Sequence, residues 1–290
     1  MYMFNNPTLK KLVNVYQLQY KNNKAQGFGD YLRGCFCLLQ IASKLGLQFD
    51  MDLSNHPMSQ CLETPKKNPN ISYNDISWHD NSNYVPLSHN TFRLNTQQFL
   101  PEFVKKLNHV DRPVYPLFCN SFPIAPFISQ QHRNIIKSKI VPNDKTKVQI
   151  ETTFRNMGIK RAQYNVIHIR CGDDYLLKEN KIDPIIIQKI ENLVIKNVKR
   201  GEKNVLVSDN NQIKIILKRR FPFLLCRICP IVHLGESTNF SEANMVHTLI
   251  DFYILSFSKS TVALSPYTWG SGFSEWVSIM NSIPYRKYFL

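Results

Sequence analysis

The sequence predicts an α/β protein of two units, each a parallel sheet covered by helices. Two observations carry this prediction. Apolar runs of strand length alternate with runs of helical periodicity, and the length of 290 residues suits roughly two domains of about 150 residues each. Strands separated by helices of about 10–15 residues favour a parallel sheet with both faces covered. We expect an N-terminal half, residues 1–145, a C-terminal half, residues 146–290, and a cleft between them.

The first fifty residues predict a strand–helix–strand unit. Residues 12–20 alternate in strand fashion, and a glycine turn at residues 27–30 precedes a helix over residues 31–45 that stops at Gly46. Residues 47–52 predict a second short strand. Residues 54–142 are rich in proline and asparagine, which predicts irregular structure and helices that complete the first half.

The second half alternates more regularly. Its periodicity predicts strands at residues 164–170, 204–208 and 261–264, an apolar run over 224–234, and helices at 184–198, 210–220, 241–256 and 273–280. Ligands of such sheets bind at the carboxyl ends of the strands. Candidate chemistry therefore lies where these strands end.

The composition favours a globular protein with an anionic partner. Hydrophobic residues make up 43% of the chain, and 36 Lys and Arg against 21 Asp and Glu give a net charge of +15. No apolar run is long enough for a membrane span and no leader is visible, so we expect a cytoplasmic protein. Its basic surface could contact an anionic membrane. No nucleic acid is expected, because no RNA- or DNA-binding signature appears.

Seven cysteines, an odd number, favour reduced thiols over a disulfide framework. Cys226, Cys229 and His233 could form a metal knuckle. No second Cys/His pair follows at zinc spacing, so we expect buried thiols and no metal.

The strongest motif follows the strand at residues 164–170. His168 and Arg170 lie on one face of that strand because side chains alternate, and an arginine fork is suited to a diphosphate. Gly172 permits a tight turn that exposes Asp173 and Asp174. The structural alternative is a core histidine with an Arg–Asp ion pair.

This motif resembles the first peptide motif of the GDP-fucose-dependent fucosyltransferases of the α1,2-, α1,6- and protein-O- types. Residues 205–222 are similar to the second motif of that superfamily, a strand, Ser-Asp and a helix. Residues 251–256 with 271–276 are similar to the third, and the turn at residues 27–34 is similar to the glycine loop. The four segments occur in family order.

The resemblance implies a GT-B-like fold of two Rossmann-like halves, with the acceptor on the N-terminal side and GDP-fucose on the C-terminal side. It implies fucosyl transfer with inversion to a hydroxyl of a glycan or glycolipid, without a cofactor. Arg170 would contact the β-phosphate, and Ser208, Asp209 and Asp251 would lie near the guanosine or the sheet end beneath it. The remaining substrate-binding positions that it implies are Gly27, Phe28, Gly29, Arg33, His168, Gly172, Ser271, Gly272 and Phe273.

Inverting transfer also calls for a carboxylate that accepts the proton of the acceptor hydroxyl. Asp30 and Asp173 are the first candidates, ahead of Asp174 and Glu179. Asp30 could instead be the N-cap of the helix predicted from Tyr31, and Asp173 could only orient Arg170.

Two departures leave parts of the resemblance open. Residues 265–270 look like an insertion before the third motif, so the serine that meets the phosphate is not fixed. The middle third matches no family segment, so the acceptor does not carry over.

Other interpretations also remain. Asp50 and Asp52 form a DxD pair of the kind that binds Mn²⁺ in GT-A enzymes, and Gly27, Gly29 and Gly34 approximate a dinucleotide fingerprint with its third glycine misplaced. The chain could use another GDP-sugar. It could also be a non-catalytic protein that binds nucleotide or nucleic acid.

Overall fold

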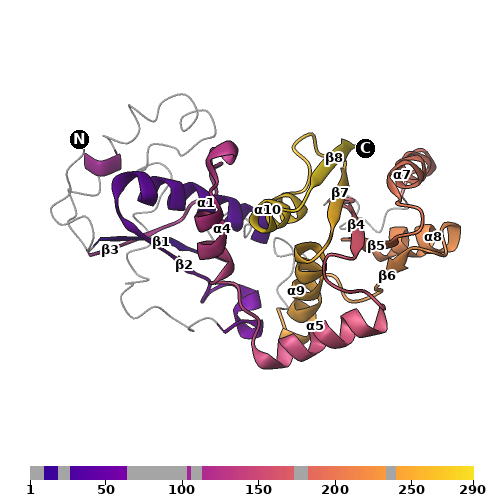
Figure 1. The fold of residues 1–290 in the computed structure, drawn as a ribbon, viewed down its shortest axis with the longest axis horizontal. Coiled ribbons are helices and arrows are strands. Elements are labelled where there is room, and N and C mark those ends of the chain that lie inside the picture. Colours follow the sequence, from indigo (N-terminus) through magenta and orange to yellow (C-terminus); the bar gives the residue numbers. More distant parts are fainter. Residues whose placement is uncertain (1–9, 19–26, 64–102, 106–112, 173–181, 233–239) are drawn as a thin grey trace. The chain divides into compact units, whose positions relative to one another are not determined.

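The protein is described by a computed structural model that covers residues 10–18, 27–63, 103–105, 113–172, 182–232 and 240–290. The chain divides into two compact units, Met1–Val141 and Pro142–Leu290. Each unit is built on a parallel sheet (Figure 1), which confirms the predicted α/β class with Rossmann-like halves. The substrates assigned to the two halves remain predictions.

The first unit holds a sheet of three parallel strands in the order β2-β1-β3. They are β1 (Lys11–Val15), β2 (Gln48–Asp52) and β3 (Val114–Leu117). Helix α1 (Phe28–Leu45) packs its apolar face on β1 and β2 and ends at Gly46, whose φ of 70° is left-handed. Shorter helices in the described part of this unit include η2 (Pro57–Cys61), η4 (Ala125–Phe127) and α4 (Gln130–Lys137).

Two predictions for this unit need correction. The strand predicted over residues 12–20 ends at Val15, because its neighbour β2 ends at Asp52 and the last ladder bond joins Tyr16 N to Asp52 O. Strand β3 was not predicted, since it contains Pro116. A proline is tolerated there because β3 is an edge strand.

The second unit holds five parallel strands in the order β6-β5-β4-β7-β8. They are β4 (Tyr164–Ile169), β5 (Lys203–Ser208), β6 (Leu225–Cys226), β7 (Ser260–Ser265) and β8 (Tyr285–Phe289). The helices are α5 (Asp144–Asn156), α7 (Pro184–Asn197), α8 (Asn211–Arg220), α9 (Glu242–Ser256) and α10 (Gly272–Asn281). The chain runs outward from β4 to β6 and returns to β7 on the other side of β4. That order creates a topological switch point between β4 and β7.

Side-chain alternation along β4 separates the two faces of this sheet. Ile167 and Ile169 join a core with residues of α7 and α8, whereas His168 points to the opposite face and contacts α10. Figure 1 shows the same division, with α7 and α8 on one side of the strands and α9 and α10 on the other. Both faces are covered, as the alternating pattern predicted.

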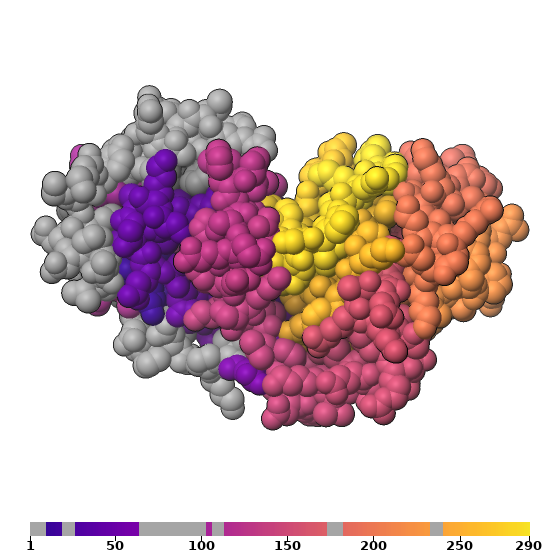
Figure 2. Space-filling model, in the orientation of Figure 1, coloured from indigo at the N-terminus to yellow at the C-terminus, as the bar shows by residue number. Residues whose placement is uncertain are grey.

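Three features of this unit differ from expectation. In its described part, residues 224–232, the apolar run supplies only the two-residue edge strand β6, and α5 and β8 were not predicted. Strand β8 has exposed charged side chains at Arg286 and Lys287, which hide its strand pattern. The segments α5 and α10–β8, pink and yellow in Figure 2, form part of the surface of this unit. Within the described ranges, no helix combines the length and apolarity of a membrane span.

Candidate functional site

The carboxyl edge of the five-stranded sheet brings three chain segments together. In the register of β4, Ile169 pairs with Ser208 of β5 and with Leu264 of β7. Arg170, Asp209 and the segment after Ser265 therefore emerge at one edge, next to the switch point. Ligands of doubly wound sheets bind in this position.

Arg170 is fixed at this edge by Asp209. Its Nη1 donates to Asp209 Oδ2, while Asp209 Oδ1 accepts from the amide of Cys171 at 2.8 Å. The two charged side chains are 16% and 14% exposed, so the pair is mostly shielded from water. The carboxylate holds the guanidinium in one orientation, as the Arg–Asp alternative anticipated. An oriented, permanently charged fork also suits a phosphate.

His168 joins β4 to the first turn of α10. Its Nδ1 lies 2.9 Å from Ser274 Oγ, and its ring is tilted against Phe273 at a centroid distance of 6.2 Å. Burial lowers the pKa of His168 to about 4, against the opposing influence of Asp209. The imidazole is therefore neutral at pH 7. It fixes the start of α10 beside Arg170 rather than adding charge to the edge.

The N-terminus of α10 presents backbone donors. Its N-cap, Ser271, is buried and makes no side-chain capping hydrogen bond. Gly272 and Phe273 occupy the first turn, where N–H groups have no partner within the helix. Such a turn favours an anion. The serine that could meet a phosphate is thus Ser271, since Ser274 already contacts His168 and Tyr285.

Ser208 and Gly172 shape the turns around Arg170. Ser208 is buried and its Oγ accepts from the amide of Asn210 at 3.2 Å, which fixes the turn into α8. Gly172 has a φ of 94°, a left-handed conformation that favours glycine. Ser208 and Gly172 therefore contribute to the site by stabilising or allowing the backbone turns near Arg170.

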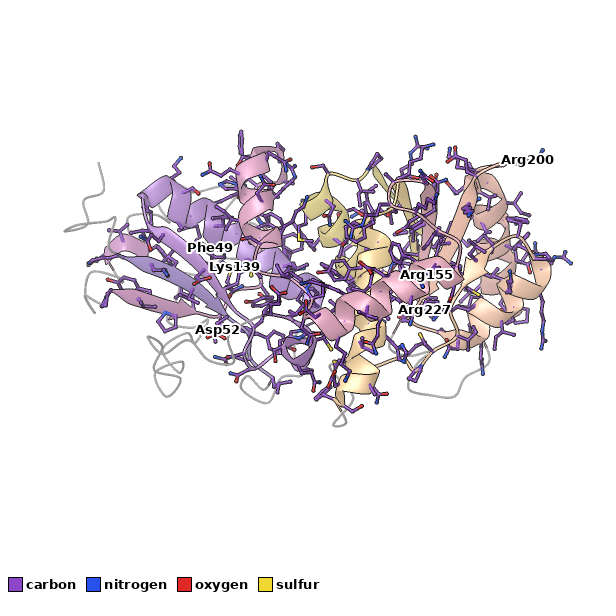
Figure 3. The ribbon with its side chains drawn as sticks, turned by 60° about the horizontal axis from the view of Figure 1, so that its bottom comes forward. Phe49, Asp52, Lys139, Arg155, Arg200 and Arg227 are labelled. Atoms are coloured by element: carbon purple, nitrogen blue, oxygen red, sulfur yellow. The ribbon has the colours of Figure 1, made fainter. Side chains whose placement is uncertain are left out.

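A second charged cluster lies beyond β5 and β6, and sequence reasoning found only its Asp251. Arg227 Nη1 donates to Asp251 Oδ1 at 3.0 Å, and its Nη2 lies 2.9 Å from His247 Nδ1. Lys214, buried in α8, donates to the carbonyl of Arg227 at 3.2 Å. Burial raises the pKa of Asp251, while Arg227 opposes that shift. Figure 3 labels Arg227 within this unit.

Two sequence signals could have led to the missed residues. Arg227 lies between Cys226 and Cys229. The interpretation of this segment considered only the two cysteines and not the arginine between them. Lys214 follows Asp209 by five residues, at the start of α8. Arg170, Lys214 and Arg227 together exceed Asp209 and Asp251 by one positive charge. The edge is therefore suited to an anion.

The first unit holds the glycine turn at the start of α1. Gly27 is the N-cap and Gly29 lies in the first turn, while the ring of Phe28 is buried against His56. The helix begins at Phe28 and not at Tyr31, so the interpretation of Asp30 as its N-cap is wrong.

Asp30 instead lies in the first turn of α1 and forms an ion pair with Arg33. Arg33 Nη1 lies 2.8 Å from Asp30 Oδ1, and Arg33 Nε donates to Asn120 O at 2.6 Å. The side chain of Asp30 is 42% exposed. Arg33 thus orients a carboxylate that remains open to solvent.

The residues of the two competing motifs have structural partners. Asp50 forms ion pairs with Lys139 at 2.8 Å and Lys11 at 3.8 Å, and Asp52 Oδ1 accepts from Ser54 N. Asp52 and Lys139 are labelled in Figure 3. Gly34 lies so close to the backbone of Cys119 that a Cβ atom would clash there, so glycine is required for packing.

Four predicted residues lie outside the described ranges: Asp173, Asp174, Glu179 and His233. Among the described residues, no three His, Cys, Asp or Glu side chains gather as a metal site. Cys226 and Cys229 are half-buried thiols.

Comparison with known proteins identifies the fold. No family model matches the chain, and no curated protein sequence matches it. NodZ, an α1,6-fucosyltransferase from Bradyrhizobium studied with GDP-fucose, matches with a TM-score of 0.51 at 12% identity, over 93% of this chain and 92% of its own. FUT1 of Arabidopsis thaliana, as a variant in complex with GDP, matches with a TM-score of 0.58 at 10% identity, over 99% of this chain and 72% of its own.

The chain has the fold of the GDP-fucose-dependent fucosyltransferases. This finding confirms the fold that the resemblance of the four motifs implied. At 10–12% identity it concerns the fold alone, and the roles of individual residues are argued below from their geometry.

Proposed function

We propose that the protein transfers fucose from GDP-fucose to a hydroxyl of a glycan or glycolipid, with inversion and without a metal. One observation carries the proposal. On a fucosyltransferase fold, Arg170 is oriented by Asp209 at the carboxyl edge of the sheet, and the uncapped N-terminus of α10 lies at the same edge. This edge offers a cationic fork and backbone amides to a diphosphate.

The chemistry requires stabilisation of the leaving group. The bond between sugar C1 and the β-phosphate oxygen breaks as the acceptor oxygen bonds to C1, and negative charge grows on GDP. Arg170 and the amides of Gly272 and Phe273 would stabilise that charge. Losing one such donor typically costs about 3 kcal/mol, roughly a hundredfold in rate.

A carboxylate would take the proton of the acceptor hydroxyl. Asp30 is our first candidate among the described residues, because Arg33 orients it and its side chain is partly exposed. Asp173 stays a prediction. The proton passes to the carboxylate as the new C–O bond forms, so no other acid or base is needed.

The cluster beyond β5 and β6 would hold the nucleoside. The Asp251 carboxylate provides acceptor oxygens of the kind that the N1–H and amino groups of guanine need, and Arg227 orients it. Lys214 and Arg227 would extend the positive charge from Arg170 toward this end. The glycan or glycolipid acceptor is part of the proposal, and so is contact between the basic surface and an anionic membrane.

Calorimetric titration of GDP, UDP and NAD, each with and without EDTA, tests the donor site. We expect binding of GDP that ignores EDTA and is abolished in Arg170→Ala, with transfer from GDP-fucose reduced about a hundredfold. Arg200→Ala, an exposed arginine of the same unit, is the matched control and should bind normally.

Other outcomes separate the competing functions. UDP binding that requires Mn²⁺ would favour the DxD pair, and turnover of Arg170→Ala near the wild-type rate would contradict the assigned role. Salt-sensitive binding of DNA or RNA without GDP affinity would favour a non-catalytic binding protein.

A further inference from the structure

The segment between β7 and α10 exposes two stacked aromatic rings. The rings of Tyr267 and Trp269 have centroids 5.0 Å apart and an interplanar angle of 16°. Trp269 is 62% exposed, which is unusual for the largest apolar side chain. Tyr267 stacks against one face of the indole, and most of the Trp269 side chain remains exposed. This segment is part of the apparent insertion at residues 265–270.

The segment is held in a defined conformation. Ser265 Oγ accepts from Tyr267 N at 3.2 Å and donates to Gly270 O at 3.3 Å, and Gly270 N donates to Tyr267 O at 2.9 Å. Lys287 of β8 donates to Trp269 O at 3.0 Å. These bonds fix the backbone on both sides of Trp269. The exposed indole is thus pre-organised, which lowers the entropic cost of binding.

The aromatic pair lies next to the donor edge. A Cβ added to Gly172, two residues after Arg170, would lie 3.1 Å from Tyr267 Oη and 3.3 Å from Pro266 Cγ. The segment also follows β7, which borders β4 at the switch point. Lys214 and Arg227 follow β5 and β6, which lie on the other side of β4 from β7, and Arg227 binds Asp251 of α9.

We propose that Tyr267 and Trp269 form a stacking platform for a hexopyranose ring of the acceptor glycan. An aromatic face carries negative charge density, and the C–H groups on one face of a pyranose carry partial positive charge. Stacking buries the apolar face of the sugar while its hydroxyls stay hydrated, so little polar desolvation is required.

This inference rests on the proposed function, which assigns the nucleoside to the side of β5 and β6. With the nucleobase on that side, the Tyr267–Trp269 platform follows β7, on the other side of β4. A purine could also stack on an indole, and the experiment must therefore distinguish a sugar from a nucleobase.

Fluorine NMR of the full chain labelled with 5-fluorotryptophan tests the platform without requiring turnover. The chain has three tryptophans, and the resonance missing from Trp269→Phe identifies Trp269. Cellobiose, lactose, maltose and di-N-acetylchitobiose are titrated with and without GDP. We expect at least one disaccharide to shift the Trp269 resonance saturably, while buried Trp276 does not respond.

The affinity for that disaccharide is then measured in variants by calorimetry. Trp269→Ala should weaken it by about tenfold or more, and Trp269→Phe by less. The matched control is Phe223→Ala, which removes an aromatic side chain that is 55% exposed in the same unit and should leave the affinity unchanged.

Three results would overturn the platform. They are a Trp269 resonance that no disaccharide shifts, a shift caused by GDP alone, or equal sugar affinity in Trp269→Ala. GDP binding by the same protein distinguishes these from failure of the proposed function. If GDP binds but sugars do not perturb Trp269, only the platform fails; if GDP does not bind, the donor assignment fails.

Discussion

His168 shows how one side chain can serve a site without touching a ligand. It lies under the first turn of α10, where its contact with Ser274 fixes the amides that we assign to the diphosphate. Because its pKa is lowered to about 4 by burial, it binds a proton less readily in the folded protein than in the unfolded chain. The stability that the neutral imidazole contributes therefore depends on pH.

We predict that His168 makes the protein less stable as pH falls below its ordinary pKa of 6.5. The stability is fully present above pH 6.5 and is lost progressively toward pH 4, since only the unfolded chain gains the proton. Between pH 7 and pH 5.5 the loss is about 1.2 kcal/mol. Denaturant unfolding of His168→Gln should show a shallower fall over this range.

His56 shares the same sign, because burial lowers its pKa to about 3, so wild type loses stability through both residues. The variant should therefore keep part of the slope. Parallel curves for wild type and His168→Gln would contradict the account.

At the residue scale, the sequence identified the donor edge but not all of its chemistry. Arg170 and Asp209 each follow a strand, and parallel strands end at one edge, so their meeting was predictable. The pairing of Arg227 with Asp251 joins residues 24 positions apart, one directly after β6 and the other in α9. Local patterns do not specify such contacts. The two cysteines near Arg227 were interpreted as buried thiols, and Arg227 itself was not singled out.

Among the elements, α1 closely approaches the segment that follows β3. A Cβ added to Gly34 would lie 1.7 Å from the carbonyl oxygen of Cys119, which follows β3. The side chain of Asn14 bridges the same place, donating to Cys119 O at 3.2 Å and accepting from Cys119 N at 2.9 Å. Helix and sheet are therefore in direct backbone contact there.

Gly34→Ala should destabilise the first unit by about 3 kcal/mol or more, because rigid backbone atoms must move to admit the methyl group. Gly27→Ala is the control, since its added Cβ would have its nearest atom at 3.6 Å and its φ is −65°. Thermal unfolding monitored by circular dichroism measures both. Equal melting temperatures for the two variants would show that the helix can shift without cost.

The elements themselves were predictable in proportion to their periodicity. Helices α1, α7, α8 and α9 were expected within a few residues of their observed bounds, because each has an apolar face and a clear end signal. Strands β3 and β8 were missed. A proline in one and exposed charges in the other obscure the pattern, and only pairing with β1 and β7 makes them strands.

At the scale of the whole molecule, charge is the dominant property. The net charge of +15 is distributed over both units and attracts anions over distances set by the ionic strength. GDP is an anion, whereas the sugar that we assign to the platform is neutral. The two ligands should therefore differ in their response to salt.

Raising NaCl from about 0.05 M to about 0.5 M should weaken GDP binding several-fold, because the Debye length falls to a few ångströms. The affinity for a neutral disaccharide should change little. Calorimetric titrations at four salt concentrations provide the measurement. Equal salt dependence for both ligands would indicate that charge does not guide the donor.

The position of β8 affects how this protein matures during synthesis. Tyr285 Oη lies 3.4 Å from Ser274 Oγ in the first turn of α10, and Lys287 Nζ donates a hydrogen bond to Trp269 O. Both residues belong to β8, which comes after the other described strands and helices in sequence order. While Tyr285 and Lys287 remain within the ribosomal tunnel, the carboxyl edge of the sheet lacks these two contacts. A nascent chain therefore cannot complete this edge until translation has passed β8.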